Sequence, residues 1–343
     1  AYSPQGYLLY LREKNLVVQP FDAQRLEMTG DAVPLAENIQ IFPQTYSAMF
    51  SAWGAGDLVY ETSTTMGVAQ LKWFDRTGKE LGILGTPANQ GNPRISPDGR
   101  RVALDILDPR TGNMDIWAYE ASGALPTRLT THAALDSGPI WSPDGRRIAF
   151  FSLRLSHPDL FLKNSDGSGE DELLLEADST KYTTDWSSNG FLLYRVLGGD
   201  FNIQLWLMPM QGDRKPYPFL KTSFGVSHGQ FSPDGRWVAY SSNESGTWEV
   251  YVAPFPGPGG NWKISAEGGG NEPRWRHDGK ELFYLAPDGT LMAVGVRGQT
   301  QQFDADPPKP LFKIRGRQHI SSGDLYLYDV AADGQRVLVN TDV

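Results

Sequence analysis

Short runs in which apolar and polar residues alternate follow one another along most of the chain, each bounded by a turn. The clearest case is residues 231–255, FSPDGRWVAYSSNESGTWEVYVAPF, where a Pro-Asp-Gly turn lies between two alternating stretches. Alternation with a period of two is typical of β-strands that bury one face, and Pro-Asp-Gly favours a tight turn that glycine closes in the left-handed conformation. The pattern predicts a β-hairpin at this position.

The same unit recurs at a nearly constant interval. Its clear copies have turn glycines 44 to 46 residues apart, at Gly99, Gly145, Gly190, Gly235 and Gly279. Three weaker copies turn at Gly6, Gly56 and Gly334. A period of about 45 residues is typical of the four-stranded blade of a β-propeller.

Each unit holds enough alternating runs for four strands. Third runs follow the turns at residues 114–120, 158–164, 203–209 and 248–254, and fourth, more polar runs lie at residues 127–131, 172–177, 217–222 and 261–266. The sequence predicts an all-β protein, a single β-propeller of antiparallel four-stranded blades over residues 1–343.

The two ends of the chain bear on the number of blades. Residues 8–39 align with residues 282–314, and the unit at Gly334 stops after two runs. Seven units and a half predict a ring of seven blades closed by strands from both termini, with eight blades as the alternative. A chain that begins inside one unit and ends inside another is also expected to be a fragment of a longer protein.

Charge and composition exclude several classes of function. The chain has 31 Lys and Arg against 40 Asp and Glu, a net charge of −9 without a basic block, so it would repel nucleic acid. No window approaches the roughly 20 apolar residues of a membrane span. The absence of cysteine excludes disulfides and thiolate chemistry. Nothing in the sequence predicts a cofactor.

Residues at fixed places in the repeat have structural interpretations. The turn aspartates are expected to accept hydrogen bonds from turn amides, at Asp98, Asp144, Asp234, Asp278 and Asp333. The large apolar residues just before the turns are expected to pack between blades, at Ile95, Trp141, Trp186, Phe231 and Trp275. Neither set predicts a ligand site.

The positions that begin each first strand differ from blade to blade in charge and type. They converge at one mouth of the predicted channel: Asn92, Arg94, Asp136, Asp185, His228, Gln230, Glu272, Arg274 and Asp324. A constant scaffold with one variable rim is typical of a binding face, although a solvated rim without a ligand is the alternative. Arg94 and Arg274 are candidates to hold an anionic group, and Asp136, Asp185 and Glu272 to hold a cation or a basic peptide.

No catalytic or metal-binding motif is present. The five histidines show neither H-x-x-x-H nor H-E-x-x-H spacing, there is no G-x-S-x-G, and the kinase motifs H-R-D and D-F-G are absent. We therefore predict a non-catalytic binding or sensor module that takes a protein, a peptide or a small molecule. The alternatives are an enzyme of hydrolase, lyase or lactonase type with its site in the channel, and a structural or assembly propeller.

The repeat core W-S-P-D-G-R-x-I-A-F, followed by D-I-W or E-V-Y in the third run, resembles the TolB-type, WD-repeat-like propellers of bacteria. Residues 92–284 carry this resemblance most clearly. Residues 255–296 and 328–340 also resemble the propeller region that follows the kinase domain and membrane helix of bacterial serine/threonine protein kinases. The resemblance implies an extracytoplasmic sensing or binding domain, with a kinase or another domain fused outside this segment.

Overall fold

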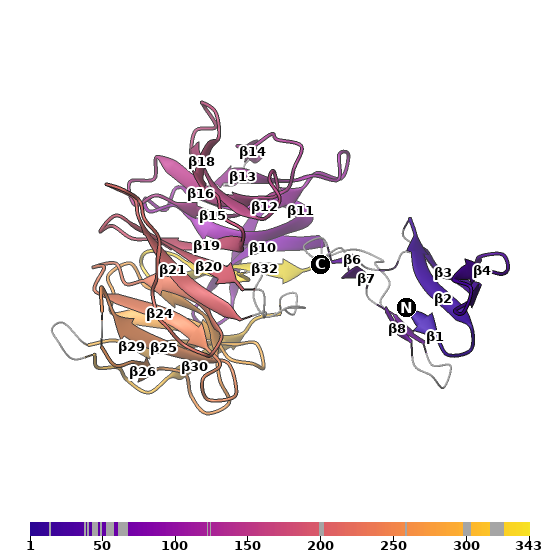
Figure 1. Ribbon diagram of the computed structural model, residues 1–343. Helices are drawn as coiled ribbons and strands as arrows, with labels where there is room; N and C mark the ends of the chain where they lie inside the picture. Colours follow the sequence, from indigo (N-terminus) through magenta and orange to yellow (C-terminus); the bar gives the residue numbers. More distant parts are fainter. Residues whose placement is uncertain are drawn as a thin grey trace. The chain divides into compact units, whose positions relative to one another are not determined.

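The computed structural model describes residues 1–13, 15–37, 39, 41–42, 47–48, 50–52, 58–60, 68–121, 123, 125–198, 202–257, 259–297, 303–315 and 326–343. The chain divides into two compact units, Ala1–Met66 and Gly67–Val343, where the sequence predicted one domain over residues 1–343 (Figure 1). All regular secondary structure of the described residues is β-strand, which confirms the all-β prediction.

Four sheets of the second unit each contain four consecutive antiparallel strands. They are β15 (Asp136–Trp141) to β18 (Glu172–Leu175) through β16 (Arg147–Ser152) and β17 (Asp159–Asn164), and β19 (Thr180–Trp186) to β22 (Tyr217–Pro218) through β20 (Phe191–Leu197) and β21 (Ile203–Pro209). The other two are β23 (Val226–Phe231) to β26 (Trp262–Lys263) through β24 (Trp237–Ser242) and β25 (Glu249–Pro254), and β27 (Asn271–Trp275) to β30 (Lys309–Lys313) through β28 (Glu281–Leu285) and β29 (Thr290–Gly295). The predicted third and fourth strands are confirmed within a few residues.

A seven-stranded sheet contains two further blades that share one long strand. Its order is β14 (Thr127–Arg128), β13 (Met114–Glu120), β12 (Arg101–Leu107), β11 (Glu80–Ile95), β10 (Val68–Asp75), β32 (Arg336–Asp342) and β31 (Tyr328–Val330). The first part of β11 pairs with β10, and the part from Gln90 onward pairs with β12. β11 is therefore the outer strand of one blade and the inner strand of the next.

The described strands of the second unit form a closed ring of six blades, one fewer than the seven predicted. The inner strands β11, β15, β19, β23, β27 and β31 contact one another in that order, and β31 contacts β11. The closing blade combines β31 and β32 from the C-terminal end with β10 and β11, and β10 lies directly beside β32 (Figure 1). Because β10 occupies this place, the ring closes without the strands at Gly6.

The turns have the predicted chemistry. Gly99, Gly145, Gly190, Gly235, Gly279 and Gly334 all have φ between 66° and 80°. The Oδ1 atoms of the turn aspartates accept the amide two residues later, at 3.1 Å for Asp98, Asp144 and Asp234. The same bond measures 3.0 Å for Asp278 and 2.9 Å for Asp333. Each of these carboxylates therefore accepts a hydrogen bond within its own hairpin.

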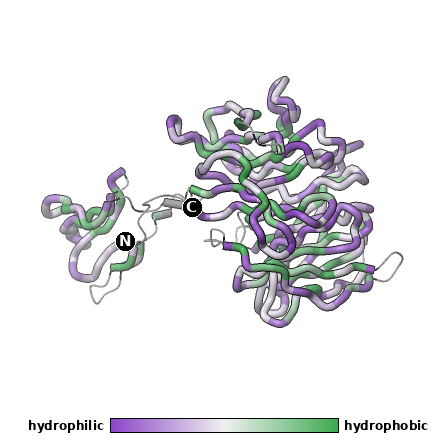
Figure 2. Tube along the Cα trace, turned by 180° about the vertical axis from the view of Figure 1, so that it is seen from behind, coloured by the Kyte–Doolittle hydropathy of each residue, from purple (hydrophilic) through white to green (hydrophobic). Residues whose placement is uncertain are grey.

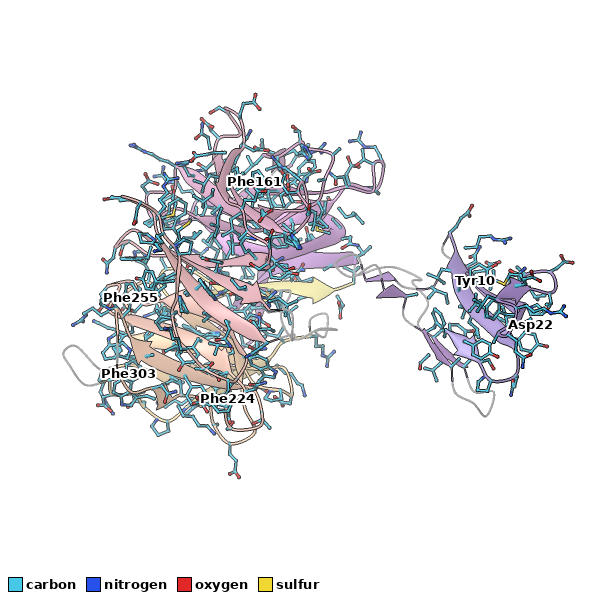
Figure 3. All side chains as sticks on the ribbon, viewed as in Figure 1. Tyr10, Asp22, Phe161, Phe224, Phe255 and Phe303 are labelled. Carbon is cyan, nitrogen blue, oxygen red and sulfur yellow. The ribbon has the colours of Figure 1, made fainter. Side chains whose placement is uncertain are left out.

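Apolar residues of neighbouring blades form one cluster at each blade-to-blade contact. Trp275 packs with Trp237, Ala239 and Val250 of the preceding blade, and Phe303, labelled in Figure 3, belongs to the same cluster. Trp141 likewise packs against Ala103 and Ile116 of the blade before it. The hydrophilic residues concentrate on the connecting loops (Figure 2). The periodic aromatics are thus core residues, as predicted.

The first unit contains a small sheet and two short hairpins. The sheet has the order β1 (Tyr2–Ser3), β2 (Tyr7–Arg12), β3 (Asn15–Asp22) and β4 (Glu27–Met28), with β5 (Val33–Ala36) also paired to β3. The hairpins are β6 (Ile41–Phe42) with β7 (Ser47–Ala48), and β8 (Phe50–Ala52) with β9 (Leu58–Tyr60). Its core centres on Leu9, Leu16 and Ile39.

Candidate functional site

The inner strands of the ring carry a bulge at the same place in successive repeats. The pairing register shifts between Gly91 and Arg94, Ser137 and Ile140, Ser227 and Gln230, and Asn271 and Arg274. Inside these bulges Asn92, Gly138, His228 and Glu272 have φ values of 51°, 65°, 50° and 54°. Positive φ is unusual for residues other than glycine, and bulges redirect side chains. Asn92, Gly138 and His228 line one central cavity.

The ring of Tyr326 gathers three of the predicted rim residues. The guanidinium of Arg94 lies 4.6 Å from the ring centroid and that of Arg274 lies 3.8 Å from it. The imidazole of His228 meets the same ring edge-on, with centroids 5.1 Å apart. Cations over an aromatic face attract its π-electrons, so Tyr326 stabilises two positive charges that would otherwise repel each other.

Asn92 connects three blades close to the Tyr326 side chain. Its Nδ2 donates to Asp105 Oδ1 at 3.1 Å, and its Oδ1 accepts the amide of Tyr326 at 3.0 Å. Ser137 Oγ donates to the other oxygen of Asp105 at 2.6 Å. Since all four residues are buried, this network fixes the wall of the cavity rather than leaving Asn92 open to a ligand.

The guanidinium groups of Arg94 and Arg274 are buried beside Tyr326 with few hydrogen-bond acceptors. Arg274 is fully buried, and its Nε lies 3.4 Å from Asp329 Oδ1. Within the described part of the chain, its Nη1 and Nη2 have no hydrogen-bond partner. Burial lowers the pKa of Arg94, and the charge of Arg274 lowers it further. Burial opposes the charge of Arg274, but the nearby carboxylates of Asp329 and Glu272 raise its pKa and compensate part of that charge.

The cavity itself measures about 20 Å³ and is lined by positive and neutral groups. Arg94 and Arg195 both line it, and none of its described lining residues is aspartate or glutamate. Arg195 Nη1 donates to Ser227 Oγ at 3.4 Å, and its guanidinium lies 4.4 Å from the centroid of Tyr182. The space suits one or two water-sized groups, such as the oxygens of a carboxylate head.

Two predicted rim residues instead connect neighbouring blades. Asp185 Oδ2 accepts the amide of Phe231 at 2.8 Å, and Gln230 Oε1 accepts the amide of Trp275 at 2.7 Å. Burial raises the pKa of Asp185, with the charge of Arg94 opposing that rise. Both side chains therefore hold the inner strand of the next blade in place.

The remaining acidic candidates do not gather into one site. Glu272 Oε2 accepts the amide of Leu327 at 2.8 Å. Asp136 is fully buried and pairs with Arg154 at 2.7 Å. Asp324 lies outside the described residues. The structure thus assembles the basic candidates around Tyr326, whereas Asp136 lies apart with Arg154. Asp185 and Glu272 bind backbone amides, and their charges act on Arg94 and Arg274 respectively.

Three residues of the site were not among the predicted ones: Arg195, Tyr326 and Asp329. Asp329 lies five residues before Gly334, the same repeat position as Arg94, Asp185, Gln230 and Arg274, and its Oδ2 accepts the amide of Ile95 at 2.8 Å. The constant spacing of five residues before the turn glycine could have identified Asp329 from the sequence. The signal for Arg195 is a single charge inside the apolar run of residues 191–197.

Two buried carboxylates lie close together on the second unit. Asp115 pairs with Arg128 at 2.6 Å, and Asp136 pairs with Arg154 at 2.7 Å. The two aspartate side chains have no exposed area. Burial raises the pKa of Asp115 to about 6, the charge of Arg128 opposes the rise, and the charge of Asp136 adds to it. Because the pKa of an unfolded aspartate is about 3.9, the contribution of Asp115 to the stability of the folded protein falls as pH rises from about 4 to 6.

Replacing Asp115 with asparagine is expected to remove this pH dependence. In the parent protein, Asp115 is expected to lower the free energy of unfolding by about 3 kcal/mol between pH 4 and pH 6.5, because its pKa differs by about two units between the folded and unfolded states. This decrease should be absent in Asp115→Asn. Urea unfolding at both pH values measures the difference. The matched control is Asp178→Asn on the exposed surface. An identical pH dependence in Asp115→Asn and the parent would contradict the assignment.

Two negative findings concern the described residues alone. No three of their histidine, aspartate and glutamate side chains are placed to hold a metal ion. They also form no helix long and apolar enough to cross a membrane.

Comparison with known sequences finds a family model that matches part of the repeat. The family model described as TolB beta propeller domain matches residues 68–216. An uncharacterised protein of Agrobacterium fabrum is 25% identical over 203 residues, which cover 56% of this chain and 68% of that protein. The Tol-Pal system protein TolB of Wolinella succinogenes is 23% identical over 208 residues, covering 59% of this chain but only 38% of that protein.

Solved structures agree on the fold. The structure of a TolB-type protein from Agrobacterium tumefaciens superposes with a TM-score of 0.63 at 17% identity, covering 80% of this chain and 98% of the other. An oligogalacturonate lyase in complex with manganese gives 0.51 at 16% identity, covering 78% and 76%. At these identities the likeness concerns the fold alone, and none of these matches is a kinase. The chain carries a β-propeller of the TolB type.

Proposed function

We propose that the propeller is a non-catalytic binding module whose central cavity holds a carboxylate group of a protein, peptide or small-molecule partner. The observation that carries this proposal is the composition of the cavity, where Arg94 and Arg195 occur without any carboxylate among the described lining residues. Arg274, on the ring of Tyr326, adds a third positive charge nearby. Arginine binds carboxylates strongly because its planar donors match their two oxygens.

The size of the cavity limits what can enter. About 20 Å³ admits the head of a carboxylate, and the rest of the ligand must lie at the channel mouth. A cation or a basic peptide is a poorer occupant, because Asp136, Asp185 and Glu272 already bind Arg154 and backbone amides. The positive φ values of Asn92 and His228, which both line the cavity, support the same place, since backbone strain is common at ligand sites.

The module is proposed to lie outside the cytoplasm, as the TolB resemblance implies, and to be attached to a further domain such as a kinase. Support for the location is the match of residues 68–216 to the TolB propeller. We expect a protease to digest this segment when it is added to cells whose outer layers are permeabilised but whose cytoplasmic membrane is intact. Protection until the cytoplasmic membrane is broken would contradict the location.

Formate is the probe for the cavity, and formamide is its neutral counterpart of similar shape. Formate at tenfold excess over its dissociation constant is expected to stabilise the protein by about 1.4 kcal/mol, roughly 2–4 °C in thermal midpoint. Formamide should leave the midpoint unchanged. Arg94→Gln and Arg195→Gln should each abolish the response to formate, measured against each variant's own midpoint.

The control variant is Arg297→Gln, because Arg297 is a mostly exposed arginine that pairs with Asp304 and Asp306. It should keep the full response to formate. An equal response in the parent, Arg94→Gln and Arg195→Gln would show that formate acts through the general surface, and the carboxylate site would be wrong.

A further inference from the structure

The first unit repeats the C-terminal end of the ring. Its sheet β1–β2–β3–β5 has the order of β27–β28–β29–β30, and its hairpin β8–β9 follows as β31–β32 follow that blade. Tyr2 pairs with Leu8 as Trp275 pairs with Leu282, and each residue lies four positions before its turn glycine. Residues 1–60 therefore have the arrangement of a last blade and its closing hairpin.

One face of this sheet is covered as in the ring. Leu9, Leu16 and Ile39 form its core with Phe50 and Leu58. The corresponding residues of the ring pack in the same way against β31 and β32, at Phe283, Leu291, Ile314, Tyr328 and Val337. The hairpin β8–β9 thus occupies the place of a following blade.

The opposite face is largely open, and its residues are Tyr2, Leu8, Tyr10, Val17, Gln19, Phe21 and Met28, of which Val17 alone is buried. Tyr2 is 48% exposed, whereas its counterpart Trp275 is 6% exposed. Tyr10, labelled in Figure 3, is partly exposed, whereas its counterpart Tyr284 is fully buried. In the ring, Trp237, Ala239, Val250 and Val252 of the preceding blade cover this face. No described residue of the first unit takes their place.

We propose that this open face docks a four-stranded sheet of the same repeat, which the same polypeptide supplies ahead of Tyr2. Residues 1–66 would then complete a second propeller placed before the ring. The open face corresponds to the face that contacts the preceding blade in the ring. The face toward a following blade is already covered by β8 and β9. A second copy of the chain would present an identical face, and blades pack front to back, with unlike faces in contact. Exposed aromatic and aliphatic side chains on a sheet face are typical of a buried contact.

Cysteine labelling tests the proposal, because the chain contains no cysteine of its own. Tyr2→Cys and Tyr10→Cys place a thiol on the open face, and Gln5→Cys places one in the exposed turn beside it. Each variant is made in residues 1–343 and in the protein expressed from its complete reading frame. The rate of reaction with a maleimide is measured by peptide-resolved mass spectrometry.

We expect the open-face thiols to react about tenfold more slowly in the complete protein than in residues 1–343, with Gln5→Cys equally fast in both. Tyr2 is already largely exposed, so Tyr2→Cys reports on the face even if Tyr10→Cys loosens the sheet. Equal rates in the two proteins would overturn the proposal. Protection within residues 1–343 that grows with protein concentration would also overturn it, since a second copy would then be the occupant.

Discussion

A chain that ends at Gly334, and so lacks β32, is expected to lose cooperative folding of the ring. β32 is the strand through which the two ends of the ring join, since it pairs with both β10 and β31. Its residues Val337, Leu338 and Val339 are at most 1% exposed. Burying three such side chains contributes about 4–9 kcal/mol, comparable to the whole stability of an ordinary domain.

Thermal unfolding followed by circular dichroism measures this loss. The matched control removes only Val343, which is 79% exposed, and should change the stability by less than about 0.5 kcal/mol. A chain ending at Gly334 that still melts cooperatively within a few degrees of the parent would show that the ring does not depend on closure by β32.

Lys181→Met is expected to lower the free energy of unfolding by about 3–5 kcal/mol, which corresponds to roughly 6–15 °C in the thermal midpoint. Lys181 Nζ lies 2.7 Å from Asp159 Oδ1, and the two side chains are 1% and 2% exposed. The pair joins β17 to β19 of the next blade. Removing the lysine leaves a carboxylate buried without its cation, which is far more unfavourable than removing both charges.

The double variant Asp159→Asn with Lys181→Met separates this effect from the other interactions of Lys181. Asparagine keeps the acceptor for the amide of Ala177, which bonds Asp159 Oδ1 at 3.3 Å, and removes the buried charge. It should recover most of the stability that Lys181→Met loses. A double variant as unstable as Lys181→Met would mean that the hydrogen bonds from Lys181 Nζ to the carbonyls of Ala177 and Ser179, rather than the ion pair, stabilise the contact.

The repeat made the blades predictable in detail. Turn chemistry and alternation are local properties, so the hairpins at Gly99, Gly145, Gly235 and Gly279 and the strands after them could be placed from the sequence. The number of blades was not a local property. The units at Gly6 and Gly334 are both weak copies of the repeat, and only strand pairing shows that β10 and β32 close the ring.

The site was predictable in part. Variation along one rim of the repeat identified Arg94, His228 and Arg274, and Tyr326 brings these three together. The same reasoning could not separate them from Asp185 and Gln230, which have equivalent positions but bind amides of the next blade. Which role a rim residue takes depends on the blade beside it.

The amino-acid sequence by itself determined the strands, the turns, the period and the apolar faces, because each depends on residues within a few positions of one another. Tertiary structure alone decided the ring of six, the two compact units and the cavity lined by Arg94 and Arg195. These depend on which strands pair and which faces meet across long separations in the chain. The periodic pattern leaves that choice open because every blade presents a similar surface to its neighbours.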